Sequence, residues 1–311
     1  MLVSGLSVIK NGIRLGYPFL ESIRSAIDIC EEFVVVVDPG EDNTVEMLRE
    51  LQLAEPKLKI IETIWSEKVR PQKCVLAQQT NIGLHQCKGD WVLYLQANEV
   101  LHENDLPHLL KLMKEHRDNA EVEAMLLERL TFWADYTHLL KVYPDRFKFS
   151  TRIVRPHIGT HSIRDAMSFA VFDEWSRRGR YPRAIDTGVN VYRYGKVLSS
   201  SAMKLKQSEA VQESIRNAEE KGTLDFLSIY EVPGQYVGAF AGEHPKVMSA
   251  RVDNTPAAYE ADSSAVRRKL SLRERRRLLE TAFYRNCGFP RWRNTRYKLL
   301  GKYLSKDRGD Y

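Results

Sequence analysis

The feature that most constrains the fold is a short apolar run that ends abruptly in polar side chains. Residues Trp91–Leu95 are all apolar and follow the turn Gly89-Asp90. A short apolar run after a turn predicts a strand that is buried on both faces. Gln96, Asn98 and Glu99 come directly after it. Because ligands of open α/β sheets bind at the carboxyl ends of the strands, the cluster predicts a ligand site; the alternative is a plain polar strand end.

Short apolar strands alternate with amphipathic helices along the N-terminal part of the chain. We predict strands at 2–9, 33–37, 58–64, 91–95, 122–130, 151–156 and 189–194, and helices at 18–30, 45–53, 74–87, 104–116 and 202–221. Strands that alternate with helices predict an α/β fold with a mostly parallel central sheet flanked by helices.

Composition narrows the class of protein. The chain has 311 residues, of which 43% are hydrophobic, so it is long enough for a sizeable core. It has no run of 18 apolar residues and no signal-peptide pattern at its start. The four cysteines form no C-x-x-C pair, which is typical of reduced, packed thiols. We therefore expect a cytoplasmic protein, either free or peripherally attached to a membrane.

The order of these motifs resembles that of the family 2 glycosyltransferases. That family has a strand, a helix and a second strand, and then an acidic turn that ends in Asp-x-Thr. Here the turn is Asp42-Asn43-Thr44 after Asp38, and a later family asparagine matches Asn81. The resemblance covers residues 1–105. It implies the Rossmann-like A-type glycosyltransferase fold and a nucleotide-sugar donor, with UDP favoured.

The resemblance also implies which residues bind the donor. In the family, the end of the first strand and the acidic turn hold the base and the ribose, for which carboxylates are suitable hydrogen-bond acceptors. The corresponding residues here are Ile9, Asn11, Asp38 and Asp42. Lys73 and Arg70 precede the third helix, where they are either phosphate ligands or ordinary surface charges.

The chain departs from the family pattern at the expected metal site. Family members hold a divalent metal on the diphosphate with an Asp-x-Asp triplet and a later histidine. Here the triplet is Gln96-Ala97-Asn98, and Arg193 stands where the histidine is expected. Divalent metals prefer carboxylate oxygens, whereas arginine binds phosphate directly. We predict that Gln96, Asn98 and Arg193 contact the donor without a metal; the alternative is a weak Mn²⁺ or Mg²⁺ site at Glu99.

The candidate catalytic base is Asp165. It lies in the segment 162–169, which resembles the acceptor-site segment of the family, where an aspartate faces the reacting carbon of the sugar. Asp173 and Glu174 are rival candidates, and the alternative for Asp165 is that it braces a loop. The resemblance implies transfer with inversion to a saccharide or lipid-linked saccharide, as in polysaccharide or lipopolysaccharide assembly. The rival functions are a catalytically degenerate nucleotide-sugar or glycan-binding protein and a nucleotidyltransferase.

Charge and motif order suggest three regions. Residues 1–105 form the nucleotide-sugar-binding half, 106–245 the acceptor-binding half, and 246–311 a basic, aromatic-rich extension with a helix that begins at Ser271. Within it, residues 267–308 carry a net charge of +12, so the rest of the chain carries −6. Such a tail is typical of a segment that binds an anionic membrane surface. The alternative is a helix that packs on the rest of the protein and exposes its charged face to solvent. We expect no nucleic-acid partner, because nothing upstream resembles a nucleic-acid-binding fold.

Overall fold

The computed structural model describes residues 1–66, 74–141, 149–174, 178–197, 234–254 and 296–302, with residues 270–272, 275–276, 278–279 and 283. The strands are β1 Val3–Lys10, β2 Glu32–Asp38, β3 Leu58–Glu62, β4 Trp91–Tyr94, β5 Glu99–Leu101, β6 Ala124–Thr131, β7 His138–Leu140, β8 Phe149–Val154, β9 Thr160–Ile163, β10 Ser168–Val171, β11 Arg183–Arg193, β12 Val237–Ala239 and β13 Lys298–Lys302. The helices are α1 Phe19–Arg24, α2 Thr44–Ala54, α3 Val75–Gln86, α4 Leu106–Glu115 and α6 Ser249–Asp253.

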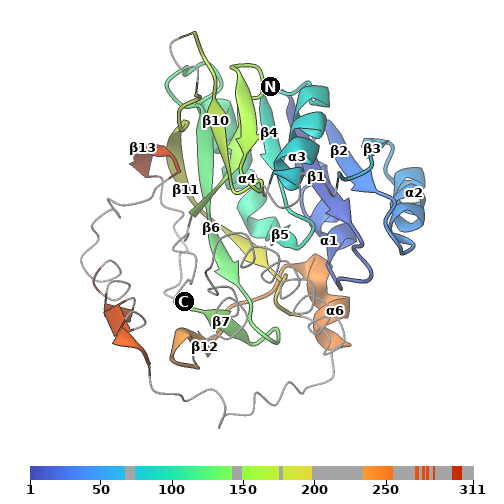
Figure 1. Ribbon diagram of the computed structural model, residues 1–311, viewed down its shortest axis with the longest axis vertical. Helices are drawn as coiled ribbons and strands as arrows, with labels where there is room; N and C mark the ends of the chain where they lie inside the picture. The colour runs from blue at the N-terminus through green and yellow to red at the C-terminus, as the bar shows by residue number, and fades with distance from the viewer. Residues whose placement is uncertain are drawn as a thin grey trace, which may run out of the picture.

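A nine-stranded sheet forms the centre of the molecule (Figure 1). Its order is β13-β11-β6-β8-β4-β1-β2-β3, and β5 pairs with β11. Strands β3, β2, β1 and β4 are parallel to one another, and so are β13, β11 and β6. Strand β8 lies between these two groups and is antiparallel to both β4 and β6. The sheet is therefore mostly parallel, as predicted.

The alternation of side chains along β2 divides the core between the two faces of the sheet. Val35 and Val37 pack in one buried cluster with Phe19 of α1 and Leu48 of α2. Val34 and Val36 belong to the cluster on the other face, which also contains residues of α3 and of the β9–β10 hairpin. A strand buried on both faces has no polar side, which explains its unbroken apolar sequence.

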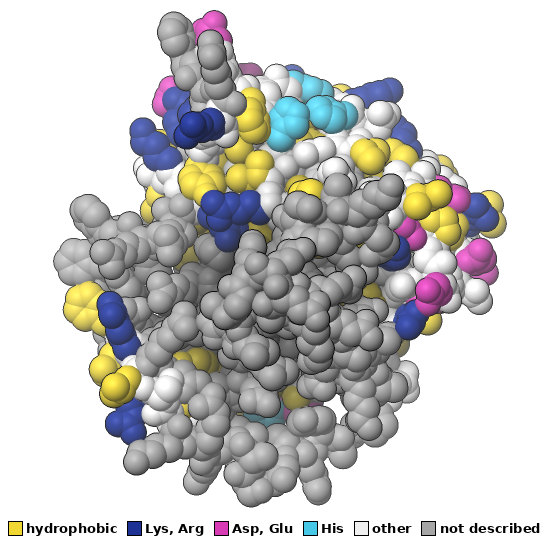
Figure 2. All heavy atoms as spheres, in the orientation of Figure 1, with side chains coloured by type: hydrophobic (Ala, Val, Ile, Leu, Met, Phe, Trp, Pro, Cys, Tyr) yellow, Lys and Arg dark blue, Asp and Glu magenta, His cyan; other side chains and the backbone are white. Residues whose placement is uncertain are grey.

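Helix α2 is a typical covering helix. Leu48 and Leu51 are buried, whereas Glu46, Arg49 and Glu50 are exposed. Figure 2 shows acidic and basic side chains side by side over this part of the surface, at the right of the view. The helix is therefore held by its apolar face, and its charged face is left to solvent.

The predicted strands and helices of the N-terminal half are confirmed with small differences in their bounds, except for the helix predicted at 18–30. There α1 ends at Arg24, and a short 3-10 helix follows at Ile27–Ile29. The predicted helix at 202–221 lies outside the described residues, as does most of the predicted helix that begins at Ser271. The sequence did not suggest that Lys298–Lys302 forms a strand at the edge of the central sheet. Among the residues that the structure describes, no helix has the length and apolar content needed to cross a membrane.

Candidate functional site

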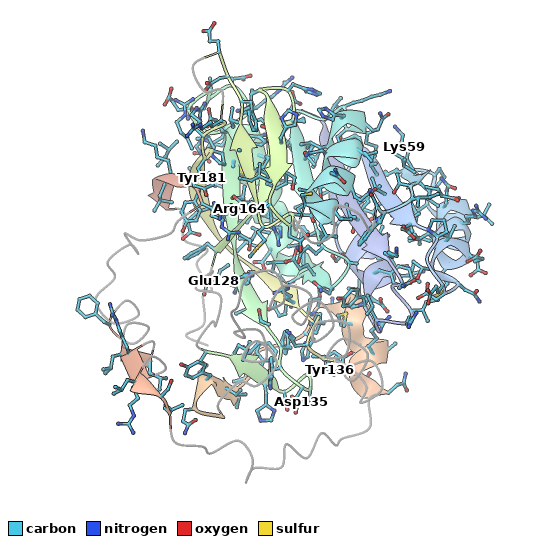
Figure 3. All side chains as sticks on the ribbon, in the orientation of Figure 1. Lys59, Glu128, Asp135, Tyr136, Arg164 and Tyr181 are labelled. Carbon is cyan, nitrogen blue, oxygen red and sulfur yellow. The ribbon has the colours of Figure 1, made fainter. Side chains whose placement is uncertain are left out.

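A cavity of about 590 Å³ opens at the carboxyl ends of the parallel strands. Residues after β1 and β4, the last residue of β11 and the first residues of β8 line it, together with the turn between β9 and β10. Figure 3 labels Arg164 in this turn and Glu128 on β6. The cavity thus lies at the sheet edge where the polar cluster at residues 96–99 predicted a ligand site.

Basic side chains outnumber acidic ones in the lining of the cavity. Among the described residues, two carboxylates line it, those of Glu41 and Asp165, against six basic side chains. The basic residues are Lys10, Arg14, Arg129, Arg152, Arg193 and Arg296. Low-dielectric walls with charges of one sign concentrate the electrostatic field, so such a cavity is suited to an anionic ligand.

A buried ion pair stands at the base of the cavity. The Arg152 guanidinium donates from Nε to Glu99 Oε2 and from Nη2 to Glu99 Oε1, each at 2.7 Å. The side chain of Glu99 is fully buried and that of Arg152 is 4% exposed. Burial disfavours the charged carboxylate, but Arg152 outweighs burial and holds the pKa of Glu99 below its ordinary value. Glu99 is therefore ionised and bound to arginine.

The residues at the family's metal position do not fit a divalent metal. Gln96 and Asn98 offer amide oxygens, and Glu99 Oε2 already accepts bonds from Arg152 and from the Gln96 backbone N–H. The described part of the chain contains no cluster of three His, Cys, Asp or Glu residues that could bind an ion. Divalent cations require several oxygen ligands, usually carboxylates. The alternative of a weak metal site at Glu99 is thus disfavoured by the partners of that carboxylate.

Asn98 and Arg193 lie close together at this edge. Arg193 faces Glu99 in the β5–β11 register, and the Asn98 carbonyl accepts a 2.8 Å bond from the Tyr194 N–H. The amide of Asn98 lies over Gly195, where a Cβ would come within 2.4 Å of Nδ2. Asn98 Oδ1 is buried and has no hydrogen-bond partner among the described residues. Both side chains line the cavity, as does Gln96.

Asp165 also lines the cavity. It occupies the β9–β10 turn between Arg164 and Ala166, both of which have left-handed backbone, with φ of 57° and 49°. The rival Asp173 accepts a 2.8 Å bond from Arg180, and neither it nor Glu174 is among the described lining residues. The geometry thus favours Asp165 over its rivals, although its role as the base stays a prediction.

Asn11 lines the cavity, but Ile9, Asp38 and Asp42 are not among its described lining residues. Ile9 is 1% exposed and packs in the core. Asp38 accepts bonds from Lys10 Nζ, the Trp65 N–H and the Gly40 N–H, and Asp42 accepts from Arg14 and Thr44. Lys73 and Arg70 lie outside the described residues. Asp38 and Asp42 thus shape the loops around the cavity, and donor contact by these residues stays a prediction.

Sequence reasoning missed several lining residues. Arg129 and Arg152 are arginines inside predicted strands, and such buried charges were a signal that they face a site. Lys10 and Trp65 meet through Asp38, with the Lys10 ammonium 5.3 Å from the centre of the Trp65 ring. Arg296 had no comparable signal, because it was one of many arginines in the basic tail.

The fold and the cavity define an α/β domain with a cavity rich in basic side chains at the carboxyl edge of its sheet. Residues 17–168 match the sequence model of glycosyl transferase family 2. The chain therefore carries a family 2 glycosyltransferase domain over these residues, with the A-type fold, and the resemblance seen in the sequence is confirmed.

Solved structures give more distant likenesses, and no curated protein matches the chain. S. aureus TarS 1–349 in complex with UDP aligns with a TM-score of 0.37 and 18% identity, over 51% of this chain and 48% of that chain. S. aureus TarS gives 0.40 and 16%, over 74% and 43%. GalNAc-T7 with UDP, GalNAc and Mn²⁺ gives 0.32 and 16%, over 43% and 24%. This chain spans less than half of each, and likenesses this distant add nothing to the family match.

Proposed function

We propose that the protein is a glycosyltransferase that moves a sugar, with inversion, from a nucleotide sugar to a saccharide or lipid-linked saccharide, without a divalent metal. UDP is the favoured nucleotide because members of the family commonly use UDP-sugars. The observation that carries the proposal is the cationic lining of the cavity at the family's donor position, with Arg193 and amides in place of metal ligands.

The donor's diphosphate would lie against the arginines of the cavity. Arg193 and Arg129 belong to neighbouring strands, β11 and β6, and Arg193 faces Thr131 in their register. The planar guanidinium is permanently charged and can bind two phosphate oxygens at once. Gln96 and the Asn98 amide would add neutral hydrogen bonds. The nucleoside would extend toward Asn11, Lys10 and Trp65, which line the cavity beside the end of β1.

Stabilisation of the leaving group is the step that a metal performs in other members of the family. As the bond from the sugar's anomeric carbon to the diphosphate oxygen breaks, negative charge develops on the nucleoside diphosphate. Hydrogen bonds to charged groups contribute about 1.5–3 kcal/mol each. Guanidiniums held on rigid strands need little rearrangement during the reaction, which makes their stabilisation effective.

Asp165 would remove the proton of the acceptor hydroxyl. The acceptor oxygen forms its bond to the anomeric carbon on the face opposite the departing diphosphate, so the configuration inverts. A positioned base of this kind contributes about 10²–10⁴-fold to the rate. The place of Asp165 in the cavity turn supports this role.

The rival functions differ in what the cavity must contain. A nucleotidyltransferase normally needs several carboxylates that bind Mg²⁺. The described lining contains two, Glu41 and Asp165, so this function is disfavoured. A degenerate binding protein is favoured by one observation, the amides at Gln96 and Asn98. Such a protein would bind the nucleotide and leave the sugar donor intact.

Donor hydrolysis in EDTA separates these functions. Wild-type protein with a panel of UDP-sugars is expected to release UDP, faster still when the correct acceptor is present. Arg193→Ala is expected to lose most activity, Arg193→Lys to keep part of it, and Asp165→Asn to lose transfer while it still binds donor. Arg49→Ala on exposed α2 is the matched control. Full activity in Arg193→Ala would refute the role of that arginine, and binding without any turnover would support the degenerate protein.

A further inference from the structure

We propose that Arg296 binds the diphosphate of the donor, so that the C-terminal segment 296–302 completes the donor cavity. This proposal builds on the proposed function and names a residue outside the family-matched segment, which ends at residue 168. Arg296 and Tyr297 both line the cavity, although Asp165 precedes them by more than a hundred positions in the sequence.

Backbone pairing holds this segment beside the site. Strand β13 runs parallel to β11, with Lys298 opposite Arg183 and Leu299 opposite Ala184. The Lys298 N–H also donates to the Pro182 carbonyl at 2.9 Å. The segment is therefore an edge strand of the central sheet, and its pairing with β11 fixes its position.

A second set of contacts ties the segment to the hairpin that carries Asp165. Ser168 is buried at the start of β10, and its hydroxyl donates to the Arg296 carbonyl at 3.1 Å. Tyr297 and Leu299 pack against the buried cluster that includes Phe169. With its backbone fixed by the hairpin on one side and β11 on the other, the Arg296 side chain has a defined place in the lining.

The chemistry of the cavity indicates what Arg296 binds there. It shares the lining with Arg129 and Arg193, and a guanidinium can bind the paired oxygens of a phosphate group. Arg296 directly precedes β13, which pairs with β11 of the central sheet. The affinity for the sugar donor would therefore depend on whether β13 is paired with the sheet.

The test compares UDP with uridine, which lacks the phosphates, in EDTA. UDP affinity is measured by calorimetry and uridine affinity by ligand-observed NMR at millimolar concentration. Arg296→Ala and Arg296→Gln are expected to weaken UDP about tenfold or more and to leave uridine unchanged. Arg296→Lys should recover part of the loss. Lys298→Ala removes an exposed cation from the same strand and should bind UDP like wild type.

Each other outcome contradicts the proposal in a recognisable way. Unchanged UDP affinity in both Arg296→Ala and Arg296→Gln, while wild type binds UDP, overturns the role of Arg296 alone. Equal losses for UDP and uridine would mean that the residue supports the fold of the cavity and does not contact phosphate. Failure of the wild-type protein to bind any nucleoside diphosphate would overturn the proposed function together with this role.

Discussion

At the scale of single residues, the pair Glu99–Arg152 decides what the base of the cavity can bind. Its two bonds are both 2.7 Å, and neither side chain has appreciable contact with solvent. A carboxylate that is held in this way serves as an internal counter-charge for arginine. It also faces Arg193 across the β5–β11 pair, so one buried anion lies near two guanidiniums. Glu99 therefore organises the cationic cavity, whereas a free carboxylate would have favoured a metal.

Glu99→Gln should destabilise the protein in a pH-dependent way. Because the pKa of Glu99 is lowered in the folded protein, its contribution to the free energy of unfolding is complete above the usual glutamate pKa of about 4.3. It is lost as the pH falls through the lower pKa of the folded state. At pH 7 we expect a loss of about 3–5 kcal/mol, because Arg152 is left buried without its partner.

Urea unfolding of both proteins from pH 7 down to pH 3 measures this difference. The gap between wild type and Glu99→Gln should narrow as the pH falls. Glu46→Gln, on the exposed face of α2, is the control and should change little at any pH. A gap that stays constant over this range would mean that the pKa of Glu99 is the same in the folded and the unfolded protein, so that Arg152 does not lower it.

At the scale of elements, the position of Asp165 depends on how the β9–β10 hairpin is held. Asn81 of α3 makes two bonds to Ser162 of β9: its Nδ2 donates to the carbonyl at 3.0 Å, and its Oδ1 accepts from the N–H at 2.7 Å. An asparagine side chain here mimics the pairing of a strand. The family motif at Asn81 thus has a structural reason, which is to fix the hairpin against the helix.

Asn81→Ala should loosen the hairpin and with it the candidate base. We expect a stability loss of about 1–3 kcal/mol, since two backbone groups of Ser162 lose their partners. Transfer should slow through kcat because Asp165 loses its fixed position. The Kd for UDP should rise by a smaller factor, because Arg129 and Arg193 lie on other strands and only Arg296 is held by this hairpin. Asn43→Ala is a suitable control, since Asn43 is exposed and its side chain does not cap α2. An unchanged kcat in Asn81→Ala would contradict the prediction, because it would mean that the position of Asp165 does not depend on the bonds between Asn81 and Ser162.

At the scale of the whole molecule, the parts predicted from sequence are those that local patterns determine. The run Phe33–Val37 could only be a strand buried on both faces, and the polar residues after Leu95 had to meet the ends of neighbouring parallel strands. Gln96 and Asn98 follow from this local pattern, whereas Asp165 and Arg193 follow from the resemblance to the family, and all four line one cavity.

The contacts that were not predicted join distant parts of the chain. Glu99 and Arg152 are 53 positions apart, and Ser168 and Arg296 are 128 apart. No periodicity within a segment reveals such pairs, because they follow from strand order and register. Asp38 was predicted to contact the ligand from its position after a strand and the resemblance to the family. Its carboxylate instead accepts bonds from Lys10 and from the backbone N–H groups of Gly40 and Trp65.

In the proposed mechanism, arginines and not a metal hold the diphosphate. Calorimetric titration of UDP and of GDP, first in EDTA and then with Mn²⁺, tests it most directly. We predict clear binding of a nucleoside diphosphate in EDTA, stronger for UDP, with an affinity that Mn²⁺ does not change. Binding that appears only with Mn²⁺ would contradict this account and restore a metal to the site.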